Sequence, residues 1–310
     1  MIATTGFFDG VHRGHRLVIE RLVSLARKRG DESLVVTFWP HPRAVLQNGA
    51  RELRLLTTLE EKKALLSALG VSRVEVLDFS RSFAALTAEQ FLRDVLRDRL
   101  GVTTLLMGYD NRVGSDRLTA SKLHPLAEAI GIELIELSPL SFRPEAAPLS
   151  FRPEAAPLSF RPSEARGEIS STRIRKSLED GDIASATDML GYGYSLTGVV
   201  VAGNRLGRTI GFPTANMRLY EPLKLVPGRG VYVVEVQVLG KTWRGMTNIG
   251  LRPTVGGTFT TIETHILDFD EDIYGLPLTI TFLRRLRDEV HFPSLEELKA
   301  QLERDREACR

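Results

Sequence analysis

The chain has 310 residues, and its 41 lysines and arginines nearly balance its 39 aspartates and glutamates, so the formal net charge is +2. This balance excludes a general positive field that would recruit nucleic acid or an anionic membrane, and we expect neither as a partner. With 43% hydrophobic and 26% charged residues, the composition is that of an ordinary globular protein, and the length predicts about two domains.

The sequence also limits targeting and thiol chemistry. Its longest apolar runs fall far short of the ~18 residues that span a bilayer, and no signal-peptide pattern precedes Gly6. We therefore expect a cytoplasmic protein. Cys309 is the only cysteine, which excludes a disulfide within the chain and a metal cage built from thiolates.

Between residues 2 and 137, short apolar runs alternate with amphipathic stretches. Apolar residues recur with helical spacing in residues 16–28, 59–69 and 88–100, which indicates helices. This alternation predicts an α/β domain in which helices cover a parallel sheet. The expected strands are residues 2–5, 33–38, 73–77, 103–107 and 132–137.

A nine-residue repeat follows this region. Residues 139–147 read PLSFRPEAA, residues 148–156 are identical, and residues 157–165 read PLSFRPSEA. Two prolines in each unit prevent a regular helix, and the unit is too short to form a solenoid. We interpret the segment as an irregular, largely disordered loop inserted in the first domain, with a proline-rich docking segment as the alternative.

The second half has a different character. Helical spacing returns at residues 170–190, with a break at Asp180 and Gly181, and from Tyr194 onward the chain has the pattern of short β-strands. Such strands need closure to hide their edges, so we expect a small antiparallel barrel, closed by a helix at residues 293–306. The expected strands are residues 196–201, 230–238, 241–249, 261–267 and 277–286.

The first candidate site is a glycine-rich loop, GFFDGVHRGH, at residues 6–15. The loop follows the first strand and begins the first helix, which predicts an anion site at the carboxyl edge of the sheet. Its glycines allow the backbone to approach a phosphate, and His12 and His15 can converge on one side of the first helical turn. A tight turn with two surface histidines is the alternative.

This loop resembles the HxGH motif of the nucleotidyltransferase superfamily, in the extended form found in bacterial FAD synthetases. The resemblance implies a Rossmann-like fold and adenylyl transfer from ATP with release of pyrophosphate. An attacking phosphate needs no general base, whereas the α-phosphate and the leaving pyrophosphate need positive charge and hydrogen-bond donors. The resemblance therefore implies that His12 and His15 are catalytic and that ATP contacts Gly6, Phe7, Asp9, Gly10 and Gly14.

A second segment, ISSTRIR at residues 169–175, resembles the ISSTxxR motif that closes these domains on the triphosphate. Ser170 or Ser171 is a natural N-cap, which leaves Thr172 and backbone amides to face phosphate oxygens. The resemblance implies that Arg175 binds phosphate and that Ser171 and Thr172 contact ATP. A capped, basic surface helix is the alternative.

Two further segments resemble the flavin contacts of this family. FWPHP contains Phe38, Pro40 and His41, and its paired prolines stiffen the backbone around a ligand. GYDNR contains Asp110 and Asn111 and follows the fourth expected strand. Val113 departs from the family's pattern, because an aromatic residue usually stands at that position.

The second half carries its own constellation, GNRLGRTIGFPTAN, at residues 203–216. It resembles the riboflavin kinase signature that ends in PTAN, in which Thr214 and Asn216 hold Mg²⁺ and the nucleotide phosphates. Hydroxyl and amide oxygens suit a hard cation that completes its shell with water and phosphate. The resemblance assigns ATP contacts to Gly203, Arg208 and Gly211, and a turn-rich hairpin without a ligand is the alternative.

Downstream segments extend this resemblance. Asn248 in NIGLRPT is an expected flavin contact, and Glu263 in ETHILDF matches the family's catalytic base. A primary alcohol attacks a γ-phosphate poorly unless a carboxylate accepts its proton, so the residue type suits the role. Without the resemblance, Glu263 could equally form a cross-strand ion pair.

Together the two halves resemble the bacterial bifunctional riboflavin kinases and FAD synthetases over nearly the whole chain. The expected fold is an α/β nucleotidyltransferase domain at residues 1–187 and an all-β riboflavin kinase domain, a small antiparallel barrel with a closing helix, at residues 188–310. The implied reactions convert riboflavin to FMN and FMN to FAD, with ATP as co-substrate and Mg²⁺ as cofactor.

Two alternatives remain at this point. The repeat could displace the ISSTRIR segment and leave only the kinase active. The chain could also be a flavin-binding or RNA-binding regulatory protein derived from these domains. The second alternative is disfavoured because His12, His15, Arg175 and Glu263 are all present, together with both residues of PTAN expected to bind Mg²⁺.

Overall fold

The computed structural model describes residues 1–46, 53–108, 111–137, 169–203, 206–254 and 257–310. Its contacts divide the chain into two units, Met1–Leu53 with Thr57–Glu168 and Arg54–Leu56 with Ile169–Arg310. The nine-residue repeat lies outside the described residues, so its interpretation stays a prediction. In the described part of the chain, no helix is both long and apolar enough to cross a membrane.

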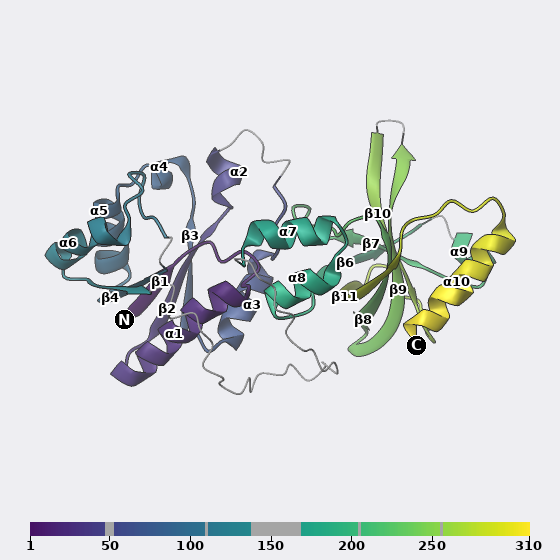
Figure 1. Ribbon diagram of the computed structural model, residues 1–310, viewed down its shortest axis with the longest axis horizontal. Coiled ribbons are helices and arrows are strands. Elements are labelled where there is room, and N and C mark those ends of the chain that lie inside the picture. The colour runs from purple at the N-terminus through teal and green to yellow at the C-terminus, as the bar shows by residue number, and fades with distance from the viewer. Residues whose placement is uncertain (47–52, 109–110, 138–168, 204–205, 255–256) are drawn as a thin grey trace. The chain divides into compact units, whose positions relative to one another are not determined.

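The first unit is built on a five-stranded parallel sheet with the order β3-β2-β1-β4-β5 (Figure 1). The strands β2 and β3 lie on one side of β1, and β4 and β5 lie on the other, so the strand order changes direction at β1. In sheets of this kind, ligands bind beyond the carboxyl ends of the strands at the place where the order changes. This sheet confirms the predicted α/β domain. Its strands are β1 (Ile2–Thr5), β2 (Ser33–Trp39), β3 (Arg73–Asp78), β4 (Thr104–Gly108) and β5 (Glu133–Leu137).

Helices cover both faces of this sheet, as its alternating hydrophobic pattern predicts. One face packs on α1 and α3 through Ile19, Leu22 and Leu66, and the other packs on η2 and α6 through residues such as Leu96 and Leu123. The helices are α1 (Arg13–Arg29), α2 (Pro42–Leu46), α3 (Leu59–Ala68), α4 (Arg81–Ala84), α5 (Ala88–Gln90), the π-helical η2 (Phe91–Arg99) and α6 (Ala120–Ile130).

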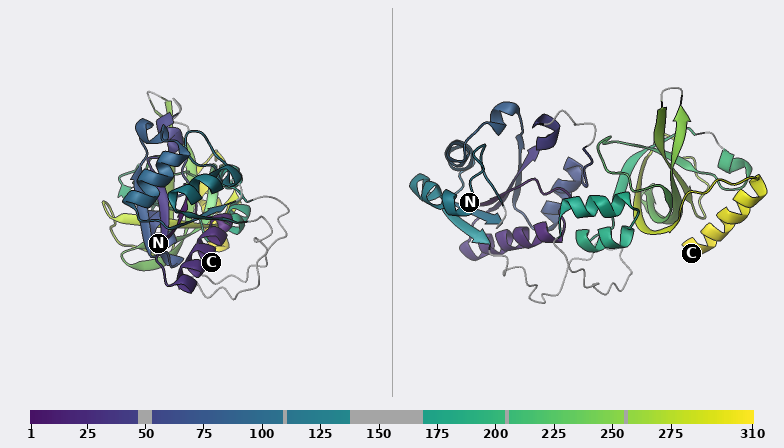
Figure 2. Two further views of the ribbon diagram at one scale, coloured as in Figure 1. Left: turned by 90° about the vertical axis from the view of Figure 1, so that its left-hand side faces the viewer. Right: turned by 45° about the horizontal axis from the view of Figure 1, so that its top comes forward.

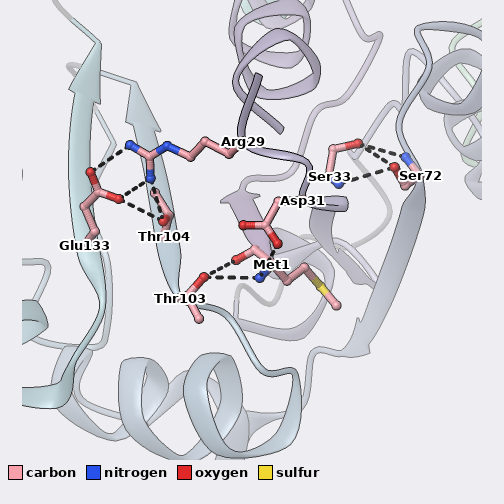
Figure 3. Close-up of polar contacts among 8 residues, drawn as sticks. All are labelled: Met1, Arg29, Asp31, Ser33, Ser72, Thr103, Thr104 and Glu133. Atoms are coloured by element: carbon pink, nitrogen blue, oxygen red, sulfur yellow. Dashed lines mark hydrogen bonds and ion pairs between the residues drawn. The ribbon is translucent and has the colours of Figure 1, made fainter. Parts of the chain in front are cut away.

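Polar contacts close the amino-terminal edge of the same sheet (Figure 3). Arg29 at the end of α1 hydrogen-bonds to Thr104 and Glu133, which begin β4 and β5. The amino group of Met1 lies 3.2 Å from Asp31, and the hydroxyls of Ser33 and Ser72 lie 3.1 Å apart. These contacts join the starts of the strands and leave the loops at the carboxyl edge for ligands. The amino group of Met1 also donates a hydrogen bond to the Thr103 hydroxyl at 3.1 Å.

The second unit contains a closed barrel with the strand order β10-β7-β6-β11-β8-β9, and all neighbouring strands with an assigned register are antiparallel. This barrel confirms the predicted all-β half, although β7 was not foreseen as a strand. Its strands are β6 (Ser195–Val201), β7 (Ala215–Leu219), β8 (Gly230–Val238), β9 (Lys241–Thr254), β10 (Gly257–Ile266) and β11 (Pro277–Arg287).

Two helices beside the barrel share its core (Figure 2). They are α7 (Ser171–Glu179) and α8 (Ile183–Leu190), and their buried residues pack in one cluster with Tyr194 and Phe282 of the barrel. Their grouping with the second unit differs from the predicted boundary between residues 187 and 188. The boundary between the functional domains stays a prediction.

The C-terminal helix α10 (Leu295–Cys309) packs on the outside of the barrel, as expected for a closing helix (Figure 1). The buried Asp305 carboxylate accepts hydrogen bonds from Arg287 at the end of β11, the shortest at 2.7 Å, and from Gln301 at 2.8 Å. This ion pair fixes α10 to the barrel. A short helix, α9 (Leu206–Thr209), lies in the loop before β7.

Candidate active sites

The loop between β1 and α1 follows the carboxyl end of the central strand. Its backbone has positive φ angles at Phe8 (50°), Gly10 (82°) and Val11 (34°). Burial of the Phe8 and Val11 side chains holds these two residues in a conformation that they rarely adopt. A Cβ at Gly6 would lie 2.9 Å from the Phe8 ring, so the glycine allows the loop to fold back on itself. Gly14 lies in the first turn of α1.

The structure brings His12 and His15 together at the start of α1. His12 is the N-cap, its Nδ1 accepts the backbone N–H of His15 at 3.3 Å, and the two rings stack with centroids 3.6 Å apart. Burial, followed by the positive charges of His12 and Lys62, holds the pKa of His15 well below its usual 6.5. At pH 7 the ring is therefore neutral, and it can serve as a hydrogen-bond donor rather than as a cation.

His15 also has an unused polar atom. Its Nδ1 is buried and has no hydrogen-bond partner among the described residues. Buried polar atoms are nearly always paired in folded proteins, so such an atom at a loop predicted to bind phosphate indicates a place for a ligand or a water. This observation supports the interpretation of the loop as a binding site.

Asp9 is buried within this loop. Its Oδ1 accepts hydrogen bonds from the Thr57 backbone at 3.1 Å and the Thr57 hydroxyl at 3.3 Å, while the Thr57 hydroxyl accepts the Gly10 N–H at 3.1 Å. Direct contact between this carboxylate and a phosphate would bring two negative charges together. Asp9 therefore supports the turn of the loop, and its expected contact with ATP stays a prediction.

Lys62, in the first half of α3, is a residue beside this loop that no sequence motif indicates. Its side chain is buried, and its Nζ donates hydrogen bonds to the Phe7 carbonyl at 2.9 Å and to the Thr37 hydroxyl at 3.3 Å. Burial lowers the pKa of Lys62 to about 8, against the opposing negative charge of Asp9. The surrounding sequence, LEEKKALL, is typical of a solvated helix face, so only the tertiary structure reveals this amine.

The predicted flavin contacts of the first unit fall in different environments. The peptide bond before Pro40 is cis, and the centre of the His41 ring lies 3.9 Å from that of Phe7 in the loop at residues 6–15. Phe38 instead packs in an aromatic cluster of the core. The other rings of that cluster belong to Phe79, Phe83 and Phe91.

The segment after β4 is only partly described. Asn111 donates a hydrogen bond from Nδ2 to the Thr5 carbonyl at 3.2 Å, which places it at the end of β1. Asp110 lies outside the described residues, and its expected flavin contact stays a prediction. Val113, where the family usually has an aromatic residue, is buried in the core.

The ISSTRIR segment forms the start of α7, which the contacts group with the second unit. The Ser170 side chain is the N-cap and accepts the Arg173 N–H at 3.4 Å, so the capping residue is Ser170 rather than Ser171. Thr172 is exposed in the first turn. The Nε of Arg175 donates to the Arg54 carbonyl at 2.7 Å, within the same unit.

In the barrel, the PTAN segment leads into β7 and lines a pocket of about 220 Å³, here called the PTAN pocket. Thr214, Asn216 and Gly203 all line it. A Cβ at Gly203 would stand 2.2 Å from Asn216 Nδ2, so only glycine allows this close approach. Gly211 has a φ of 85°, and the Arg208 side chain lies outside the described residues.

Three polar residues lie side by side on neighbouring strands of the barrel. Glu263 on β10 pairs in register with Asn216 on β7 and with Asn248 on β9. Residues opposite one another in a sheet project to the same face. Glu263 also accepts a hydrogen bond from Arg252 Nη2 at 3.0 Å, so the cross-strand ion pair that sequence analysis left open is present.

A second pocket, of about 530 Å³, lies between the outer face of the barrel and α10 and is here called the Glu263 pocket. Asn248 also lines it, and Thr214 lines both pockets. A largely apolar pocket with a few polar groups suits a flat aromatic ligand. Its apolar lining includes Phe212, Val231, Met246, Leu298 and Leu302.

His265 is a further residue beside the PTAN segment whose role no sequence motif indicates. Its Nδ1 lies 2.8 Å from the carbonyl of Pro213, directly before Thr214. Burial lowers the pKa of His265, which favours the neutral ring, and a neutral ring can donate from Nδ1 to this carbonyl. His265 therefore fixes the backbone of the PTAN segment.

The residues of the PTAN pocket fit a magnesium ion that is bound together with a nucleotide. Thr214 offers a hydroxyl oxygen and Asn216 an amide oxygen, and Gly203 leaves room beside that amide. Mg²⁺ prefers oxygen ligands and commonly takes most of its shell from water and phosphate. Among the described residues, no cluster of histidine, cysteine and carboxylate side chains forms a separate metal site.

Comparisons with known proteins agree with both units. The family model for FAD synthetase matches residues 1–147, and the model for riboflavin kinase matches residues 190–310. A bifunctional riboflavin kinase/FMN adenylyltransferase of Escherichia coli K12 is 38% identical over 98% of this chain and 90% of its own length. The enzyme of the same name from Listeria monocytogenes is 34% identical over 100% and 91% of the two chains.

A solved structure shares the whole architecture. It is described as a macrolide-efflux protein from Streptococcus pneumoniae, is 32% identical, covers 100% of this chain and 93% of its own, and superposes with a TM-score of 0.86. The family models and the full-length relatives together show that the chain belongs to the family of bifunctional riboflavin kinases and FMN adenylyltransferases.

Proposed function

We propose that the two reactions of this family are divided between the two units of the chain. The barrel transfers the γ-phosphate of ATP to riboflavin, which gives FMN and ADP. The parallel-sheet unit uses its loop at residues 6–15 to bind a second ATP and transfers the adenylyl group of this ATP to FMN, which gives FAD and pyrophosphate. The family models support this division, because each matches one half of the chain. Both reactions need ATP, which favours the cytoplasm as the location.

In the barrel, Glu263 acts as the general base. A ribityl hydroxyl becomes a better nucleophile when a carboxylate accepts its proton as the bond to phosphorus forms. The observation that carries this assignment is the register of β7, β10 and β9, which sets Glu263 between Asn216 and Asn248 on one face. The base thus lies beside the proposed metal ligand.

The two pockets have complementary linings. We assign the flavin ring to the Glu263 pocket, because Phe212, Val231 and Met246 give it apolar walls. We assign ATP to the PTAN pocket, where Thr214 and Asn216 would hold an Mg²⁺ ion that would offset the negative charge of the phosphates. Since Thr214 lines both pockets, the transferred phosphate can meet the hydroxyl between them.

In the first unit, the histidines of the loop stabilise the transferred phosphate. The attacking FMN phosphate is an anion and needs no base, so catalysis depends on donors directed at the α-phosphate. The loop supplies backbone amides, His12 and His15, and the neutral state of His15 makes it a donor. The triphosphate contacts that the resemblance implies for Ser171, Thr172 and Arg175, which the contacts group with the second unit, stay a prediction.

A product analysis tests this function. The protein is incubated with riboflavin, Mg²⁺ and ATP, and the flavins are separated by chromatography. We expect FMN and then FAD. FMN alone would support a kinase without adenylyl transfer, and the absence of both products would support a binding protein without catalysis.

A further inference from the structure

Lys62 of the first unit is buried, and its place in α3 does not by itself explain this burial. Lys62 and Lys63 are neighbours on α3, yet Lys62 is 1% exposed while the side chain of Lys63 is 42% exposed. Burial of a charge costs free energy, and an apolar side chain of similar length would fill the same space without that cost. The presence of an amine at this site therefore points to a role for its charge or its hydrogen bonds.

Lys62 contacts the loop at residues 6–15 through Phe7. Its Nζ donates to the Phe7 carbonyl at 2.9 Å, lies 4.1 Å from the centre of the Phe7 ring, and is anchored on the other side by the Thr37 hydroxyl at 3.3 Å. Phe7 directly precedes the residues with positive φ angles. Lys62 thus holds the point where the chain turns out of β1 into the loop.

The loop has a second anchor from the same region of the chain. Thr57 holds Asp9 and the Gly10 N–H, as described above, while Lys62 holds the Phe7 carbonyl. Two anchors, on either side of Phe8, can maintain a backbone that is unfavourable by itself. The start of α3 therefore sets the conformation of the loop.

Charged and titratable groups around Lys62 come from the loop and from α1. Asp9 of the loop favours its charged form, and His12 and His15 at the start of α1 stack beside the same loop. Since the electrostatic effect of Lys62 reaches His15, a phosphate bound next to His15 would also experience this positive charge.

We propose that Lys62 is a positioning residue for adenylyl transfer, which fixes the Phe7 carbonyl and supplies a buried positive charge behind the loop that receives the phosphates of ATP. The inference rests on the proposed role of the loop at residues 6–15. Lys62 acts through the loop, so its effect belongs to the FAD-forming reaction and leaves the kinase unchanged.

The direct test compares Lys62→Gln with the wild type and with Lys63→Gln, a matched control on the same helix. FAD formation from supplied FMN is measured as kcat/KM for ATP between pH 7 and pH 9.5, a range that lies above the second phosphate pKa of about 6. At pH 7, Lys62→Gln should reduce kcat/KM by at least about tenfold, as the loss of one preorganised electrostatic group does in other enzymes. Riboflavin phosphorylation in the same sample should be unchanged.

The pH dependence separates charge from simple packing. Because the pKa of Lys62 is about 8, the wild type and Lys63→Gln should lose activity as the pH rises through that value. Lys62→Gln, which has no charge to lose, should show no such decline, and its difference from the wild type should shrink towards pH 9.5. A constant difference at every pH, or no difference at pH 7, would overturn the proposal.

A second variant addresses folding. Lys62→Met keeps the length of the side chain but leaves the Phe7 carbonyl without this donor, so it should fold with a modest loss of thermal stability while losing FAD formation. A loss of stability with normal FAD formation by the folded fraction would contradict the positioning role. If the wild type itself forms FMN but no FAD, the proposed function of the loop fails instead, which distinguishes the two outcomes.

Discussion

Glu263 on β10 lies directly opposite Asn216 on β7, and this pairing places a carboxylate that lines the Glu263 pocket next to an amide that lines the PTAN pocket. The pairing follows from the register of antiparallel strands, in which a shift by one residue would turn either side chain to the other face of the barrel. The proposed proton acceptor and the proposed magnesium ligand are therefore set by the same element of the fold.

The close packing of Gly203 on Asn216 gives a first prediction. In Gly203→Ala, the new methyl group would meet the Asn216 amide at 2.2 Å and displace it. We expect riboflavin phosphorylation to fall and to need more Mg²⁺, while FAD formation from supplied FMN continues. Gly240→Ala is the control, because nothing lies within 4 Å of its added carbon and only the strain of its positive φ is expected. Normal Mg²⁺ dependence in Gly203→Ala would argue against a metal at Asn216.

His15 gives a prediction for the first unit. His15→Ala should slow FAD formation by about 10² to 10³, the usual effect of removing one donor directed at developing charge, and should leave FMN formation intact. His124→Ala, at an exposed position of α6, should leave both rates unchanged. Equal rates of FAD formation in His15→Ala and in the wild type at saturating substrates would show that the loop does not serve this reaction.

The lowered pKa of His15 predicts an effect of pH on the stability of the first unit. Below about pH 6.5 the unfolded chain takes up a proton at this residue, whereas the folded chain resists it until a lower pH. The free energy of unfolding should therefore decrease as the pH falls below 6.5. Hydrogen exchange in α1, corrected for its intrinsic pH dependence, should report this loss, and His15→Gln should reduce it. The same pH dependence in both proteins would contradict the assignment.

Much of the fold could be predicted from the sequence, because local hydrophobic spacing determines most of its elements. The five strands of the parallel sheet and the amphipathic helix α1 follow from such spacing. The missed strand β7 is five residues long, includes the end of the PTAN motif and has mixed burial. The missed helix α6 contains Pro125, which weakens the local helix signal.

The parts of the sites that the sequence did not reveal depend on long-range contacts. Burial of Lys62 is determined by its contacts with Phe7 and Thr37, which lie 55 and 25 residues away in sequence. The bond between His265 and Pro213 joins residues 52 positions apart. The segment Arg54–Leu56, which the contacts group with the second unit, is too short to have a pattern of its own.

The most direct test of the account is a comparison of both reactions in Glu263→Gln, since Glu263 should act on the alcohol proton alone. With riboflavin and Mg-ATP, the rate of FMN formation should fall by about 10² to 10⁴, the range expected for loss of a general base. With FMN and Mg-ATP, the same sample should form FAD at the wild-type rate, and a wild-type thermal unfolding curve serves as the folding control for the barrel. Equal loss of both activities, or an unchanged rate of FMN formation, would contradict the division of the two reactions proposed for this chain.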